Sequence, residues 1–189
     1  MIRLIKANQP FFLSKLKLIL DKRKIKNPNI DSKTKFIVQD IKKNGDVALI
    51  KYEKKFSNFK NISLGKIKFT QVEKNTIIKK LDKKIKFSID LAYNRIFNFH
   101  KKQKLSSFSF SDRFKNTFSY KSNAINKVGV YVPGGLASYP SSVLMNCIPA
   151  IVAGVKNIYM TTPTMNGHYN PAVIYAAKKC KVKEIYKIG

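Results

Sequence analysis

The chain has 189 residues, of which 44% are hydrophobic, and its 38 Lys and Arg residues outnumber its 10 Asp and Glu residues to give a formal net charge of +28. This length and hydrophobic content are enough to bury a core in one domain or in two small ones. A pI near 10.1 is typical of nucleic-acid-binding proteins. However, Arg occurs at only four positions and Lys is spread over the first 127 residues, so the composition favours a Lys-rich solvated surface over a nucleic-acid site.

Cysteine use and hydropathy argue against two further classes of protein. Cys147 and Cys180 are too few for a disulfide framework and lie in apolar helical patterns, which predicts small buried thiols. No apolar run approaches membrane-spanning length. Lys15 and Lys17 interrupt the apolar start of the chain, which argues against a secretory signal. We therefore expect a cytoplasmic protein with no membrane contact.

The amino-terminal half is predicted to be mostly helical. Leu13, Leu16 and Leu20 have the spacing of an amphipathic helix, whose apolar side suits a core or a partner better than a membrane surface. A second helix is predicted to end at Asn44-Gly45, because Gly favours the left-handed conformation at a helix terminus.

Two further elements are predicted between residues 64 and 99. Leu64–Phe69 alternates apolar residues with polar or basic ones, which indicates a short strand. From Ile78 to Phe99 apolar residues recur every three or four positions, which indicates a long amphipathic helix with a break allowed near Asp82.

The next segment, from Leu105 to Ile125, is rich in Ser, Phe and Lys. Alternating aromatic residues are typical of short strands that pack on one face. Aromatic residues among lysines could also stack single-stranded bases, which is the weaker of the two interpretations. The aromatic residues are Phe108, Phe110, Phe114, Phe118 and Tyr120.

From residue 128 onward the pattern alternates strand and helix. Asn170-Pro171 marks the start of a helix, because Asn caps a helix and Pro suits its first position. Short links predict a right-handed parallel unit, in which ligands bind beyond the carboxyl ends of the strands. The predicted strands are 128–132, 157–162 and 184–188, the helices are 141–154 and 171–181, and the strand ends are Tyr131–Gly135, Thr162–Pro163 and Gly189.

These patterns together predict an α/β fold with two regions. Residues 1–125 are expected to form a mostly helical amino-terminal region with short strands. Residues 126–189 are expected to form an incomplete Rossmann-like domain, a parallel βαβαβ unit.

One run of residues carries a resemblance to a known family. Val128-Gly129-Val130-Tyr131-Val132-Pro133-Gly134-Gly135 is followed by Tyr139-Pro140-Ser141-Ser142 and by an apolar helical segment. The block from Val128 to Gly189 resembles histidinol dehydrogenase, and Asn44–Leu49 is similar to a helix-capping segment of that family. Because the family enzyme is much longer, we interpret the chain as its amino-terminal part, truncated before the catalytic and zinc-binding half.

The resemblance implies which residues of this chain would act. It implies that Tyr131 contacts NAD, with Pro133 beside it as a weaker candidate, although Pro-Gly-Gly is not a dinucleotide fingerprint. It places the zinc ligands and the catalytic His and Glu beyond Gly189, so this chain has no catalytic or metal-binding residue. His100 resembles a structural histidine of the family, and His168 is expected to be exposed in a turn.

The resemblance also implies an activity, with two alternatives left open. The family oxidises L-histidinol through L-histidinaldehyde to L-histidine with two NAD molecules, in the last steps of histidine biosynthesis, as a homodimer with one zinc per site. We predict that the 189-residue chain alone is inactive. The first alternative is a basic nucleic-acid-binding α/β module, and the second is a non-catalytic remnant whose third parallel strand has an unpaired, association-prone side.

Overall fold

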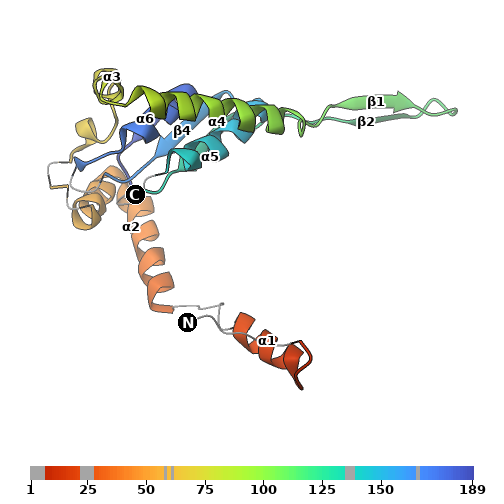
Figure 1. Cartoon of the computed structure of the whole chain (residues 1–189), viewed down its shortest axis with the longest axis horizontal. Helices are drawn as coiled ribbons and strands as arrows, with labels where there is room; N and C mark the ends of the chain where they lie inside the picture. Colours follow the sequence, from red (N-terminus) through yellow and green to blue (C-terminus); the bar gives the residue numbers. More distant parts are fainter. Residues whose placement is uncertain (1–6, 22–27, 58, 61, 135–138, 165–166) are drawn as a thin grey trace. The chain divides into compact units, whose positions relative to one another are not determined.

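The computed structural model describes residues 7–21, 28–57, 59–60, 62–134, 139–164 and 167–189 (Figure 1). Internal contacts divide the chain into two units, Met1–Ala48 and Leu49–Gly189. The predicted division between residues 125 and 126 remains a proposal about domain organisation.

The first unit is helical, as predicted. Helix α1 spans Phe12–Asp21 and buries none of its side chains. Helix α2 spans Pro28–Phe56 and passes into the second unit. It is kinked at Gly45, whose φ of 56° and ψ of −134° are not helical. The stop predicted at Asn44-Gly45 is therefore a kink, at a positive φ that only Gly adopts without strain.

The second unit is built on a three-stranded parallel sheet. Its strands are β3 (Lys127–Tyr131), β4 (Asn157–Thr161) and β5 (Glu184–Tyr186), in the order β3-β4-β5. Val130 lies opposite Met160 in β4, and Met160 lies opposite Ile185 in β5. The α/β fold class and the βαβαβ order predicted from the sequence are confirmed.

Helices of the second unit pack against one another and share the core with the sheet. The core residues include Val143, Leu144 and Ile148 of one helix and Val173 and Ile174 of another. The helices are α3 (Gln71–Lys79), α4 (Lys83–Lys101), α5 (Pro140–Ala153) and α6 (Pro171–Lys179). Their contacts join α4, α5 and α6 mutually and join α3 to α6.

Two local predictions about these helices are confirmed. The Asp82 side chain accepts a hydrogen bond from the Lys84 N–H at 2.6 Å and begins α4, so the break near Asp82 exists. The Asn170 side chain accepts one from the Ala172 N–H at 2.9 Å and begins α6, with Pro171 in the first turn.

The strand predicted at Leu64–Phe69 is wrong. A short 3₁₀ helix, η1, spans Leu64–Lys66. After it, Lys68 forms an antiparallel bridge with Tyr186 of β5. The alternation nevertheless indicates burial correctly, because Ile67 and Phe69 are buried whereas Lys68 is exposed.

This bridge corrects a second prediction, that the outer side of the third parallel strand is unpaired. The Phe69 N–H donates to the Ile185 carbonyl at 3.0 Å, and the Lys187 N–H donates to the Ile67 carbonyl at 2.7 Å. A segment more than a hundred residues earlier therefore covers the edge of β5, and that edge is not free for association.

The aromatic segment forms a separate antiparallel hairpin. Strand β1 spans Phe108–Ser111 and strand β2 spans Thr117–Tyr120. The predicted short strands are thus confirmed. All eight residues are exposed, however, so the packing on one face that the alternation led us to expect does not occur among the described residues.

Candidate functional site

The end of β3 presents one exposed ring between two buried side chains. Val130 and Val132 are buried, whereas Tyr131 is 57% exposed. The Val132 N–H donates to the Thr161 carbonyl at 2.9 Å, so β3 stays paired with β4 one residue beyond Tyr131. Because side chains alternate along a strand, this pairing directs the tyrosine away from the core. Tyr131 is therefore available for contact with a ligand ring or phosphate.

The carboxyl ends of all three strands converge on Pro163. A Cβ added at Gly134, after β3, would lie 2.5 Å from the Pro163 carbonyl oxygen and 2.7 Å from its Cγ. A Cβ added at Gly189, after β5, would lie 2.6 Å from Pro163 Cγ. Both positions therefore require glycine because the backbone passes so close to the proline ring. The structure thus brings together the three strand ends that the sequence singled out.

The two candidate cofactor contacts lie at this edge. Tyr131 ends β3, and Pro133 follows it with an exposed ring. Gly134 keeps the chain against Pro163 immediately afterwards. Gly135, the last residue of the predicted Pro-Gly-Gly loop, lies outside the described residues.

Glu53 lies beside the candidate site, and the sequence did not indicate it. Its carboxyl group, on the last turns of α2, is only 3% exposed. Oε2 accepts a hydrogen bond from the Gly189 N–H at 3.3 Å. Oε1 is buried and has no hydrogen-bond partner within the described part of the chain. A buried carboxylate thus lies at the end of β5, beside the Pro163 junction.

Burial dominates the acidity of Glu53. Loss of solvent raises the pKa of the carboxyl group above its ordinary value, because a charged carboxylate is poorly solvated in the interior. The hydrogen bonds from Gly189 and from the Ser57 side chain act in the opposite direction but do not cancel this effect. Of the two carboxyl oxygens, Oε2 accepts the Gly189 N–H, whereas Oε1 can accept a further hydrogen bond.

An ion pair between a buried lysine and a half-exposed glutamate holds the segment after β5. Lys187 Nζ lies 2.8 Å from Glu73 Oε1 and 4.5 Å from the centre of the Phe69 ring. Glu73 Oε2 also accepts the Thr70 N–H at 2.7 Å, which completes a capping box at the start of α3. Burial would raise the pKa of Glu73, but the bonds from Lys187 and Thr70 outweigh it and hold that pKa below its ordinary value.

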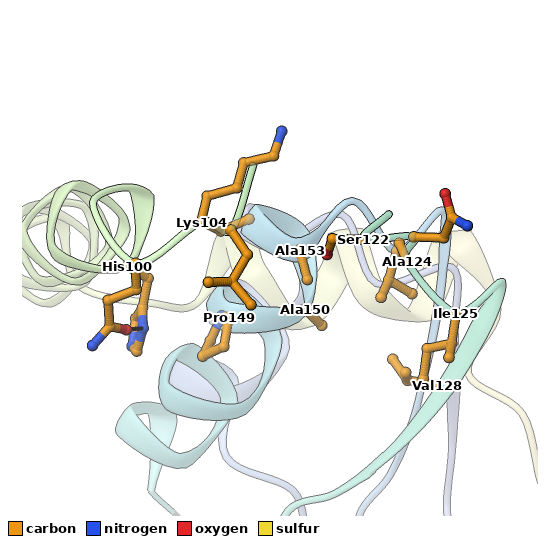
Figure 2. A pocket seen from close by; sticks show the side chains of 14 residues that line it. His100, Lys104, Ser122, Ala124, Ile125, Val128, Pro149, Ala150 and Ala153 are labelled. Carbon is orange, nitrogen blue, oxygen red and sulfur yellow. Dashed lines mark hydrogen bonds between the residues drawn. The ribbon is translucent and has the colours of Figure 1, made fainter. Parts of the chain in front are cut away.

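A pocket of about 550 Å³ lies at the other end of the sheet (Figure 2). Val128, near the start of β3, lines it, so the pocket is remote from the carboxyl ends of the strands. Figure 2 shows the Lys104 ammonium group pointing away from it. The lining residues are His100, Gln103, Lys104, Leu105, Ser122, Asn123, Ala124, Ile125, Val128, Pro149, Ala150, Val152, Ala153 and Val155.

The two cysteines lie next to each other in the core, and neither histidine joins them in a metal-binding group within the described residues. His100 Nδ1 lies 2.7 Å from Gln103 Oε1 at the end of α4, and His168 is exposed, as predicted. Cys147 and Cys180 are fully buried, as predicted, and hydrogen bonding to Cys147 together with burial raises the pKa of Cys180. Within the described residues, no three or more His, Cys, Asp or Glu side chains gather as metal ligands.

No helix in the described part of the chain is long and apolar enough to cross a membrane.

Comparisons with known proteins identify the family. The family model described as histidinol dehydrogenase matches residues 20–189. The chain is 49% identical over 189 residues to the histidinol dehydrogenase of Pelagibacter ubique, covering 100% of this chain and 43% of the relative. It is 34% identical over 185 residues to that of Neisseria gonorrhoeae, covering 98% and 43%.

A solved structure supports the same family assignment. The crystal structure of histidinol dehydrogenase from Elizabethkingia anophelis superimposes with a TM-score of 0.75 at 30% identity, covering 99% of this chain and 38% of that one. The chain therefore spans about two fifths of the length of the proteins that it matches. On these sequence and structural grounds, the chain belongs to the histidinol dehydrogenase family and corresponds to its amino-terminal part.

Proposed function

We propose that this chain provides the amino-terminal part of an NAD-dependent histidinol dehydrogenase, a cytoplasmic homodimer of histidine biosynthesis. The whole activity would be the oxidation of L-histidinol, through L-histidinaldehyde, to L-histidine. The main support is the 49% identity to the P. ubique histidinol dehydrogenase along the entire chain. The other support is the convergence of three strand ends beside an exposed tyrosine.

Within that enzyme, the role of this chain is to bind one side of NAD. Bound NAD would accept the hydride that leaves the substrate. The Tyr131 ring is exposed beyond β3 and offers a flat apolar face and a hydroxyl donor. Pro133 extends that surface, and the close passage of Gly134 over Pro163 holds the backbone of the loop in place. These residues fit a contact with a nucleotide ring or phosphate, and they orient the cofactor rather than transfer protons.

Zinc does not fit the residues described here. Its usual ligands are Cys, His and carboxylate side chains in groups of three or four, and no such group exists within the described ranges. The ligands would come from the part of the family-length protein that this chain does not contain. We therefore assign no metal-dependent step to the chain and propose that it is inactive alone.

The test uses a chimaera in which residues 1–189 of this chain replace the matched region of the P. ubique relative. Histidinol-dependent NADH formation, followed at 340 nm, should appear in the chimaera and not in the 189-residue chain. Activity in the chain alone would overturn the proposed inactivity, and a folded but inactive chimaera would count against the proposed function.

Tyr131→Ala in this chimaera tests the cofactor contact. It should raise the KM for NAD about tenfold, the loss expected when one good ring contact worth roughly 1.4 kcal/mol is removed. The KM for L-histidinol should change much less. Phe87→Ala is the control, because Phe87 is an exposed ring on α4. An unchanged KM for NAD would remove Tyr131 from the site.

A further inference from the structure

The β1–β2 hairpin has an uncovered aromatic face. Phe108 lies opposite Tyr120, and Phe110 lies opposite Phe118, so alternation along both strands puts the four rings on one side. The ring centres are 5.6 Å and 5.4 Å apart across the strands. Each ring remains 44–57% exposed. We call Phe108, Phe110, Phe118 and Tyr120 the aromatic face.

The opposite face of the hairpin is polar. It carries Ser109, Ser111, Thr117 and Ser119, and the hydroxyl groups of Ser111 and Thr117 lie 3.1 Å apart. The hairpin is thus amphipathic, and only its polar face is well solvated by water. Four half-exposed aromatic side chains of about 200 Å² each leave on the order of 400 Å² of apolar surface, an area at which exposed patches mark interaction sites.

The turn between the strands is ordered by its own hydrogen bonds. Asp112 Oδ1 accepts the backbone N–H groups of Phe114 at 2.8 Å and Asn116 at 2.9 Å. The Asn116 side chain donates to Asp112 Oδ2 at 3.1 Å. An isolated two-stranded hairpin is marginally stable in water, so this turn and the stacked rings preform a ribbon that still needs a partner for its apolar side.

The distribution of charge narrows the choice of partner. Single-strand binders place cations beside their stacking rings, but neither β1 nor β2 contains Lys or Arg. Arg113, in the turn, lies 4.7 Å over the Phe114 ring, outside the aromatic face. A second copy of the 189-residue chain carries the same +28 charge, so repulsion between like charges opposes self-association of the isolated chain through this face.

The length of the relatives indicates the occupant. This chain covers 43% of the P. ubique relative and 38% of the E. anophelis structure, so more than half of a family-length protein is polypeptide that the chain does not contain. We propose that the aromatic face is an internal interface of the family-length protein, packed against an apolar surface of that remaining part. This inference rests on the proposed function only in assuming a family-length protein.

Hydrogen exchange measured by mass spectrometry tests the interface without relying on activity. The amides of residues 108–111 and 117–120 are compared in the 189-residue chain and in the chimaera with the P. ubique remainder. They should exchange at least about tenfold more slowly in the chimaera, and equal rates would overturn the proposal. If the chimaera does not fold, the same comparison uses the P. ubique protein with only residues 105–125 replaced by this hairpin.

A double substitution provides a second test of the proposed interface. Phe110→Ser with Phe118→Ser removes one opposed pair of rings, and Ser109→Ala with Ser119→Ala is the matched control on the polar face. The aromatic variant should lower the Tm of the chimaera by several degrees and leave the Tm of the 189-residue chain unchanged, whereas the control should change neither. An unchanged Tm in the chimaera would contradict the interface.

Two other outcomes would reassign the face. Binding of a fluorescein-labelled oligo-dT at 150 mM salt, lost in the aromatic variant, would make it a nucleic-acid site. Concentration-dependent association of the 189-residue chain in sedimentation equilibrium, lost in the same variant, would make it a self-association surface. An inactive chimaera whose hairpin amides are protected from exchange would contradict only the proposed function. An active chimaera whose hairpin amides are not protected would contradict only the interface.

Discussion

Gly134→Ala tests whether the strand ends really converge on Pro163. The new methyl group would lie 2.5 Å from the Pro163 carbonyl oxygen, 2.7 Å from Cγ and 3.1 Å from Cδ. Real Cβ contacts are essentially never below 3.0 Å, so the backbone must move by about 0.5 Å, the difference between 3.0 and 2.5. Neither the carbonyl group nor the proline ring can rotate away to absorb this shift.

The expected cost follows from overpacking. An extra carbon forced into a packed site typically costs about 1 to 3 kcal/mol. For a chain of this size, each kcal/mol lowers the Tm by about 2 to 4 °C, which predicts a fall of about 2 to 12 °C. The loop that carries Pro133 would also move. Gly134→Ala should therefore weaken NAD binding in the family-length chimaera, as Tyr131→Ala should by removing the ring.

Gly129→Ala is the matched control, inside β3, the strand that precedes Gly134. A Cβ at Gly129 meets no heavy atom within 4 Å, and its φ is not positive. Alanine there should be neutral or stabilise the fold by about 0.4 to 1 kcal/mol through the unfolded chain. The assay is thermal unfolding followed by circular dichroism at pH 7. If the two variants melt within about 1 °C of each other, the close approach to Pro163 is wrong.

Two further predictions concern buried titratable groups. Because the folded-state pKa of Glu53 is raised above its ordinary 4.5, the folded protein loses stability as pH rises from 4.5 through the raised pKa. Glu53→Gln should therefore raise the Tm at pH 7 relative to the parent chain and lose this advantage near pH 4; a variant less stable at pH 7 would contradict the buried, under-bonded carboxylate. Cys147 and Cys180 are fully buried, so a disulfide reagent such as Ellman's should titrate no thiol in the folded chain and two in urea; rapid reaction in buffer would refute their burial.

Features that depend on neighbouring residues were predictable from the sequence. The Asn170 cap, predicted from its residue type, and the break near Asp82 both depend on N–H groups only two residues away. The strands and helices from residue 127 onward follow from apolar spacing, and their observed bounds differ from the predicted ones by no more than two residues.

Features that depend on distant residues were not predictable. The alternation in Leu64–Phe69 indicates which side chains are buried, but not that Lys68 pairs with Tyr186. Glu53 lies among lysines on α2 and resembles any solvated helical glutamate until Gly189 approaches it. The hairpin pattern indicates an apolar face, but the surface that covers such a face need not belong to the same stretch of chain.

The two edges of the three-stranded sheet differ, and Tyr131 lies on the edge strand β3. The outer side of β5 is occupied by the bridge from Lys68, whereas no described strand pairs with the outer side of β3. If a further parallel strand of a family-length protein joins beside β3, the strand order reverses there. Ligands in open α/β sheets bind at the carboxyl ends of strands where the order reverses, and Tyr131 and Pro133 lie at that end of β3. Slower amide exchange of residues 127–131 in the chimaera than in this chain would support the added strand, whereas unchanged exchange would leave β3 as a true edge and remove this reason for placing the cofactor beside Tyr131.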